Sequence, residues 1–239
     1  MKHVCAAYFN KSSSECIQTI EEHVKDGVIF LKEVYLERGF DRYIVRLARL
    51  LKVSISRKEA LRALYASYIF HDLGKLELGY QQRRASFGGH EVISAYWIER
   101  YGKGLGLEEM LYPVVYAIFL HHHDIRKSKP EKIMNVRLCN DCLKLLLSIY
   151  RERTLVNLTD YDVQFMGDVC ESLKEKFCRF SKDIDHDFRY FRLSYPLLEV
   201  IHAADNYSAK KRGGEKTVLS QEIQKVYNAI NSLKESYKY

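Results

Sequence analysis

Histidine and aspartate residues occur repeatedly in this chain at the ends of stretches with a helical spacing of apolar residues. The set comprises His23, His71, Asp72, His90, His122, His123 and Asp205. Such groups are rarely buried in a soluble protein unless they are paired or bind a ligand. Imidazole and carboxylate groups together suit ions such as Mn, Fe, Co, Ni or Zn. The set therefore predicts a metal site at which several segments of the chain converge.

The adjacent residues His71 and Asp72 are best placed to serve two ions. Neighbouring residues project about 100° apart around a helix, so both can reach one ion only near the helix end. Gly74 is expected to end the helix there by adopting the left-handed conformation. Because a carboxylate has two oxygens, Asp72 could bridge two ions. Two ions about 3.5–4 Å apart can hold a phosphate, activate water and stabilise the leaving oxygen of an in-line displacement.

Each of these residues also has a simpler interpretation when it is taken alone. His23 could be a hydrogen-bonded core histidine, and the run from His121 to His123 could be a solvated helix end stabilised by the helix dipole. His202, three residues before Asp205, could orient that carboxylate or simply pack within a helix. Chance explains single residues more easily than five separate polar clusters, each ending an apolar stretch. The sequence therefore favours the metal site.

A series of amphipathic segments would position these residues. The predicted helices cover residues 16–37, 41–51, 56–72, 90–101, 107–123, 131–151, 160–180, 196–211 and 219–236. Asp41 is a good N-cap for the second helix, and Ser56 with Glu59 has the spacing of a capping box at the start of the third. Residues 75–88, rich in Gln, Arg and Gly, are expected to form an exposed loop.

The composition of the chain excludes several classes of protein. Only 12 of its 239 residues are Gly and 3 are Pro. A β-sandwich or barrel of this size would need many tight turns, which Gly, Pro or Asn-Gly usually mark. No apolar run approaches the roughly 18 residues that span a bilayer, and a signal-peptide core is absent, which indicates a cytoplasmic protein. We expect an all-α fold of about eight helices in a single domain over residues 1–239, with its motif-bearing core at about 16–212.

The charge of the chain permits an anionic partner. The sum of 38 Lys and Arg against 31 Asp and Glu is +7. Basic residues adjoin the predicted ligands at Arg83, Arg84, Arg126, Lys127, Lys210, Lys211 and Arg212. Such runs are usually solvated faces, but three of them beside predicted ligands are expected where a polyanion crosses the site. Lys75, which follows the His-Asp pair, could meet a phosphate oxygen or could be a cation near helix-end carbonyls.

The six cysteines include one Cys-x-x-Cys pair, Cys139 and Cys142. No second pair completes a zinc knuckle, and both residues lie in the predicted helix 131–151. We therefore expect buried thiols at these two positions.

The ordered histidine and aspartate motifs resemble those of the HD superfamily of metal-dependent phosphohydrolases. The matching segments are Glu22-His23, His71-Asp72-Leu73-Gly74-Lys75, His90, a His-His pair and Ala204-Asp205. Within the superfamily, these segments are similar to the HD nuclease of type I CRISPR interference. That nuclease is either fused to a helicase or made as a separate chain. The absence of a Gly-x-x-x-x-Gly-Lys-Ser/Thr phosphate loop favours the separate form.

The resemblance implies an all-α HD-type helical bundle and two sets of ligands for two divalent ions. One ion would be held by His23, His71, Asp72 and Asp205, and the other by Asp72, His90 and the His-His pair. We assign the pair to His122 and His123 because they end the run, which leaves His121 as a supporting or exposed residue. His71, Asp72 and Lys75 would be the catalytic residues. The ions could be Mn, Ni, Co, Fe, Zn or Mg.

The resemblance also implies a function. The expected enzyme is a metal-dependent nuclease, an endonuclease or exonuclease, that hydrolyses phosphodiester bonds of DNA in CRISPR-mediated antiviral defence. Single-stranded DNA would be its main substrate and RNA a further one, and its partners would be a separate helicase subunit and the guide-RNA complex. One alternative is an HD phosphohydrolase acting on small nucleotides, although the Gly-Tyr-Pro signature of the cyclic-dinucleotide branch is absent. Another is a non-catalytic scaffold whose metal only staples helices together.

Overall fold

The computed structural model describes residues 5–10, 12–84, 88–122, 136–156, 188–211, 221–223 and 225–228. The helices in these ranges are α1 (Ile20–Phe30), α2 (Phe40–Leu50), α3 (Arg57–Phe70), α4 (Leu78–Arg83), α5 (His90–Tyr101), α6 (Leu111–Leu120), α7 (Asn140–Thr154) and α9 (Phe188–Lys211). The strands are β1 (Ala6–Phe9) and β2 (Cys16–Thr19), paired antiparallel. The prediction of an all-α fold is confirmed, with this small hairpin added.

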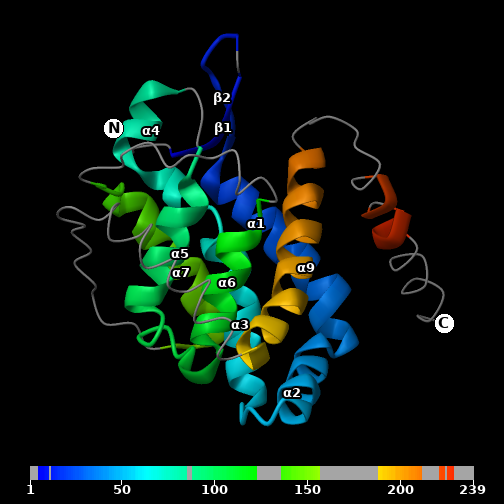
Figure 1. Ribbon diagram of the computed structural model, residues 1–239. Helices are drawn as coiled ribbons and strands as arrows, with labels where there is room; N and C mark the ends of the chain where they lie inside the picture. The colour runs from blue at the N-terminus through cyan, green and yellow to red at the C-terminus, as the bar shows by residue number, and fades with distance from the viewer. Residues whose placement is uncertain are drawn as a thin grey trace.

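Helices α3 and α9 make most of the packing contacts with the other helices. Helix α9 lies along α6 and α1, and α3 packs against α6, α7 and α9 (Figure 1). Large side chains fill the space between these helices, and among them Tyr68, Phe70, Trp97 and Tyr150 have no more than 1% of their surface exposed. A close-packed interior of this kind holds the helix ends in fixed relative positions.

The N-terminal segment differs from the predicted helix 16–37. Residues Cys16–Thr19 form strand β2, and α1 begins only at Ile20. Thr19 caps the helix, since its hydroxyl accepts from the backbone of Glu22 while the Glu22 side chain accepts from the backbone of Thr19. The helix then continues as a π turn (Leu31–Tyr35) and a 3-10 turn (Leu36–Arg38).

The starts of α2 and α3 test the two N-caps that were predicted from the sequence. Ser56 caps α3 as predicted, by accepting from the backbone of Glu59. Asp41 is not an N-cap, because α2 begins at Phe40 after Gly39, whose φ of 78° lies in the left-handed region. The buried Asp41 side chain instead pairs with Arg57, which ties the start of α2 to the start of α3.

The segment after the His-Asp pair is also more ordered than the predicted loop 75–88. It contains a 3-10 turn (Leu73–Leu76) and helix α4, and residues 85–87 lie outside the described ranges. Glu77 caps α4 by accepting from the backbone of Gly79 and Tyr80. The hairpin lies beside α4 at one end of the bundle (Figure 1), where the Gln81 side chain bonds both backbone groups of Ala6.

The later helices agree in part with the prediction. The predicted helices 131–151 and 196–211 are confirmed over 140–151 and 196–211. The first begins only at Asn140 and runs on to Thr154, and the second begins earlier, at Phe188. The predicted helix 160–180 lies outside the described residues. Residues 221–223 and 225–228 are helical within the predicted helix 219–236. Among the described residues, none of the helices is both long and apolar enough to cross a membrane.

Candidate metal centre

Five segments of the chain bring ionisable side chains to one point in the core. His23 lies in α1, His71 and Asp72 follow α3, and His90 opens α5. The turn after α6 supplies His121 and His122, and α9 supplies Asp205. Most of these residues sit at helix ends, because a turn there can point a polar side chain inward while the helix body packs its apolar face.

The first group of potential ligands surrounds one oxygen of Asp72. Its Oδ2 lies 3.4 Å from Nε2 of His23 and 3.4 Å from Nε2 of His71. Asp205 completes the group, since its Oδ1 is 3.4 Å from Nε2 of His23 and 3.9 Å from that of His71. These four residues each offer an atom within 4.8 Å of the others.

The second group surrounds the other oxygen of the same carboxylate. Oδ1 of Asp72 lies 2.9 Å from Nε2 of His90 and 3.9 Å from Nε2 of His121. His122 joins through its Nε2, which is 3.1 Å from Nε2 of His90. Asp72 therefore belongs to both groups, with a different oxygen facing each.

Hydrogen bonds to Nδ1 fix how the central histidines present their rings. Nδ1 of His71 donates to the carbonyl of Tyr68 (2.6 Å), and Nδ1 of His121 donates to the carbonyl of Ile118 (2.5 Å). A carbonyl only accepts, so the proton of each neutral ring sits on Nδ1 and the lone pair of Nε2 points toward Asp72. Metal-binding histidines are usually oriented in this way.

His23 is held by the far end of the chain. The hydroxyl of Ser208 donates to the carbonyl of His23 (3.0 Å), so its oxygen can accept from Nδ1 of the same residue (2.9 Å). Gln18 and Tyr68 add bonds to Ser208 and to the carbonyl of His23. The Nε2 atom of His23 is thereby directed at Asp72 and Asp205.

The donor set fits divalent metal ions. Among the described residues, the buried Nε2 atoms of His23, His71 and His121 have no hydrogen-bond partner. Leaving a buried polar atom unsatisfied costs about 1–3 kcal/mol, and three such atoms turned toward carboxylates are accounted for if ions bind between them. Two atoms that each bind one ion at about 2.1 Å lie about 3.0–3.4 Å apart at octahedral or tetrahedral angles, which is close to the observed separations.

The electrostatics keep the two aspartates, His23 and His122 in the state that binds cations. Burial acts to raise the pKa of Asp72, but His71 and Lys75 outweigh it and hold the pKa well below its usual range. Burial likewise opposes ionisation of Asp205, whose pKa is lowered by the bond and charge of His71 and by His23. Burial lowers the pKa of His23 to about 4, and burial with the nearby His90 lowers that of His122 to about 4. At neutral pH the aspartates are therefore charged and His23 and His122 are neutral.

Lys75 and Tyr8 complete the charge pattern. The Lys75 ammonium is buried and lies 2.6 Å from Oδ2 of Asp72, above the ring of Tyr8 at 4.1 Å from its centre. Burial opposes its charge, but the neighbouring Asp72 raises its pKa, so Lys75 stays protonated. The Tyr8 hydroxyl donates to Oδ1 of Asp205 at 3.2 Å. Tyr8 was not among the residues predicted from the sequence, because a tyrosine in a short strand 197 residues from its partner belongs to no recognisable motif.

Gly74 has a different role from the predicted one. Helix α3 already ends at Phe70, and Gly74 lies in the following 3-10 turn without a positive φ. A Cβ at this position would lie 2.1 Å from the carbonyl oxygen of His90. The backbone of Gly74 also donates to Ser94, whose hydroxyl donates to that carbonyl. Glycine is therefore required because the turn carrying Asp72 packs directly on the start of α5.

The histidine run after α6 is arranged differently from the sequence assignment. His121 is buried with Nε2 facing Asp72, rather than exposed or apart from the ligand group, and His122 lies beside it toward the surface. His123 lies outside the described residues. His202, which was considered as a support for Asp205, donates from Nε2 to the carbonyl of His121 at 2.8 Å and so steadies this turn.

The basic residues predicted to contact a polyanion are described only in part. Arg83 and Arg84 are exposed at the end of α4, and Lys210 is half-buried near the end of α9. Arg126, Lys127, Arg212 and the side chain of Lys211 lie outside the described part of the structure. The fold thus places one basic pair beside the hairpin that carries Tyr8.

A helical bundle with a His-Asp pair at its centre defines an HD domain, and the chain belongs to this family. The HD domain family matches residues 42–210, a span that includes both members of the pair, His90, His121, His122 and Asp205. His23 precedes the matched span. Members of this family bind divalent metal ions, so the chain is a metal-dependent hydrolase.

A particular relative is similar over nearly the whole chain. It is the "CRISPR-associated endonuclease Cas3-HD" of Thermoproteus tenax, 27% identical over 233 residues. The aligned region covers 91% of this chain and 95% of the relative. Both the HD superfamily and the closeness to a CRISPR-associated member, predicted from the motifs, are confirmed.

Proposed function

We propose that this chain is the stand-alone HD nuclease of a CRISPR interference system, hydrolysing phosphodiester bonds of single-stranded DNA at a centre with two divalent ions. The position of Asp72 carries the proposal, because its two oxygens face two separate groups of histidines. The similarity to the CRISPR-associated endonuclease of Thermoproteus tenax supports nuclease activity over phosphohydrolysis of small nucleotides.

The residues of the chain divide into two ligand sets. His23, His71 and Asp205 would hold one ion with Asp72, and His90, His121 and His122 would hold the other with the same carboxylate. Two ions, when bound, activate water and neutralise the charge of a phosphodiester. The sequence predicts His123 as a ligand in place of His121, and metal analysis of the two alanine variants separates these assignments.

Lys75 would act beside the ions rather than as a ligand. Its ammonium fixes the Oδ2 side of Asp72 and places a permanent positive charge in the buried centre. A phosphate drawn to the ions would meet this charge as well, which would stabilise the additional negative charge that develops during displacement. We infer that Lys75 has both roles, orienting Asp72 and attracting the substrate.

The nucleic acid would approach from the side of the hairpin and α4. Arg83 and Arg84 are exposed there, and the adjacent Tyr8 belongs to the centre itself. If neutral contacts alone held the nucleic acid, its affinity would depend little on salt. Contacts to phosphates release counterions, so they make the affinity fall as the salt concentration rises. Sequence choice would come from a guide-RNA complex and a separate helicase, which deliver the single strand to this chain.

The test uses the purified full-length chain, stripped of metal and reloaded with Mn, Co, Ni or Mg. We expect cleavage of labelled single-stranded DNA that depends on added metal and is lost in Asp72→Ala. Asp141→Ala, an exposed aspartate in the first turn of α7, is the matched control and should retain activity. Circular dichroism checks that both variants fold, and Asp205→Asn gives a second, more conservative variant of the centre.

Several outcomes would contradict the proposal. Hydrolysis of mononucleotides or cyclic dinucleotides with single-stranded DNA left intact would assign a small-nucleotide phosphohydrolase. No cleavage of any of these substrates by the metal-loaded wild-type chain would favour the non-catalytic scaffold, and cleavage by metal-depleted Asp72→Ala would rule out a metal-dependent centre. The proposed approach of DNA along Arg83 and Arg84 would be contradicted by DNA binding that does not weaken with salt. It would also be contradicted by unchanged binding in the double variant Arg83→Ala, Arg84→Ala.

A further inference from the structure

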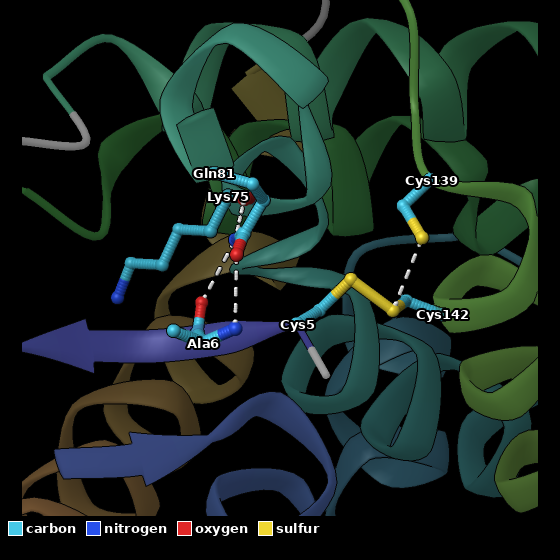
Figure 2. The surroundings of a disulfide bond; sticks show 6 residues. All are labelled: Cys5, Ala6, Lys75, Gln81, Cys139 and Cys142. Carbon is cyan, nitrogen blue, oxygen red and sulfur yellow. Dashed lines mark hydrogen bonds between the residues drawn. A yellow bond between two sulfur atoms is a disulfide. The ribbon is translucent and has the colours of Figure 1, made fainter. Parts of the chain in front are cut away.

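Three buried cysteines from two distant segments lie together, and the proposed nuclease function uses none of them. Cys5 directly precedes β1, Cys139 directly precedes α7, and Cys142 lies in the first turn of that helix. Their sulfur atoms lie within 4.8 Å of one another. Cys5 and Cys142 form a disulfide, and Cys139 is a free buried thiol (Figure 2).

This arrangement corrects half of the sequence prediction. Cys139 is the buried thiol that was expected, but Cys142 is bonded to a cysteine 137 residues away in the sequence. The prediction of a thiol at Cys142 was wrong because nothing local in the sequence connects Cys5 to α7. The structure therefore gives Cys142 two neighbours that could share a disulfide with it.

Cys139 is in position to compete with Cys5. Its Sγ lies 3.3 Å from Sγ of Cys142, toward which the thiol donates a hydrogen bond (Figure 2). Residues three apart at the start of a helix have Cβ atoms about 5–6 Å apart, close enough for small adjustments to form a disulfide. The backbone of Cys139 is anchored by its bond to the carbonyl of Leu76, at 2.9 Å.

We propose that Cys5, Cys139 and Cys142 form a thiol–disulfide exchange site. The Cys139 thiol loses its proton to solvent, and its sulfur forms a bond to Sγ of Cys142. The bond between Cys5 and Cys142 breaks at the same time, and its electron pair leaves with the Cys5 sulfur, which takes up a proton. One disulfide and one thiol are present before and after, so the step needs neither an oxidant nor a reductant.

Burial favours this internal step over reaction with outside thiols. Each of the three residues has at most 7% of its surface exposed. Cys16, the other free cysteine among the described residues, is exposed and lies in β2. The nearest nucleophile to the disulfide, within the described ranges, is therefore Cys139.

Exchange would change how β1 is held against the candidate centre. In the observed pairing Cys5 ties the strand covalently to α7. The next residue, Ala6, exchanges two hydrogen bonds with Gln81, whose side chain also donates to the carbonyl of Lys75 (Figure 2). Two residues further on, Tyr8 bonds Asp205. A disulfide between Cys139 and Cys142 would leave β1 held by hydrogen bonds and packing alone.

The experiment maps disulfides in the full-length chain. Protein is incubated at mildly alkaline pH, quenched with acid, alkylated with N-ethylmaleimide in acidic denaturant, digested and analysed by mass spectrometry. We expect peptides linked through Cys5–Cys142 and through Cys139–Cys142 in the wild-type chain. Cys139→Ser should show only the first, and Cys5→Ser oxidised with a small-molecule disulfide should show the second. Cys16→Ser is the control and should match the wild type.

A second readout follows the strand itself. Amide hydrogen exchange of residues 6–9 should be at least severalfold faster in Cys5→Ser than in Cys139→Ser. Equal rates would overturn the link between the disulfide and β1. Three results would contradict the exchange site. The wild-type chain could show only the Cys5–Cys142 disulfide with Cys139 always alkylated, all three cysteines could be free thiols, or the three could retain a zinc ion. These readouts are independent of DNA cleavage, so they stand whether or not the proposed nuclease function does.

Discussion

The Nε2 atom of His90 lies 2.9 Å from Oδ1 of Asp72, whereas the other oxygen of that carboxylate faces His23 and His71. One short side chain thus joins two sets of ligands, one from α1, the end of α3 and α9, the other from α5 and the turn after α6. A carboxylate shared in this way couples the two candidate ion sites, and each site can be removed separately by changing a histidine that belongs to one group.

The first prediction concerns the number of bound ions. We expect wild-type protein loaded with Mn and freed of excess ion to hold two equivalents, measured by inductively coupled plasma mass spectrometry. His90→Ala and His23→Ala should each hold about one, because each loses a ligand of a single group, and Asp72→Ala should hold none. A single equivalent in the wild type, or equal losses in all three variants, would contradict two separate groups.

The second prediction separates His121 from His123. His121→Ala should lose the ion held with His90, since Nε2 of His121 faces Oδ1 of Asp72 from a buried position. His123→Ala should retain both ions if His121 is the ligand. The opposite result, with metal lost only in His123→Ala, would restore the assignment made from the sequence. The same metal analysis decides between the two.

The third prediction concerns Tyr8. Tyr8→Phe removes the hydroxyl that orients Asp205 but keeps the ring beneath Lys75. Partners that orient a ligand typically contribute about 10–100-fold in metal affinity, and we expect the lower end because Tyr8 is only half-buried. Competition with a chelating dye measures the change. The control Tyr195→Phe, on the exposed side of α9, should bind metal like the wild type. An unchanged metal affinity in Tyr8→Phe would show that the Tyr8 hydroxyl does not orient Asp205 for metal binding.

The sequence predicted most of the centre because its signals are local. His71 and Asp72 directly follow an amphipathic helix, His90 begins another, and Asp205 lies within a third. Helix periodicity and the capping serine Ser56 are properties of a few neighbouring residues, so they can be read without the fold.

What the sequence did not predict depends on contacts between distant segments. The turn after α6 brings His121 to a buried position facing Asp72, which no local pattern within the histidine run indicates. The hairpin brings Tyr8 to Asp205, and Cys5 to Cys142, across most of the chain. Gly74 serves a close approach to His90, which no local pattern distinguishes from a helix stop.

The fourth prediction tests that close approach. Gly74→Ala would place a methyl group against the carbonyl of His90, and relief of the clash must move the turn that carries Asp72. Overpacking of this kind costs about 1–3 kcal/mol or more in the free energy of unfolding. Gly88→Ala is the matched control, because its Cβ meets nothing within 4 Å. Denaturant unfolding should show a lower midpoint for Gly74→Ala alone; equal midpoints would mean that the contact is not maintained in solution.

The fifth prediction concerns competition between protons and metal at His71. Burial acts to lower the pKa of His71, but Asp72 and Asp205 outweigh it and raise the pKa above 6.5, whereas that of His23 is lowered to about 4. A ligand histidine must be neutral, so metal binding releases the His71 proton at any pH below this raised pKa. The affinity for metal should therefore fall by up to about tenfold per pH unit as the pH drops below the pKa of His71, and should level off as the pH rises through it.

Titration calorimetry in two buffers of different ionisation enthalpy measures the released proton. His71→Gln, which binds no proton, should bind metal more weakly and release about one proton fewer. Identical proton release in both proteins would show that another group carries the pH dependence.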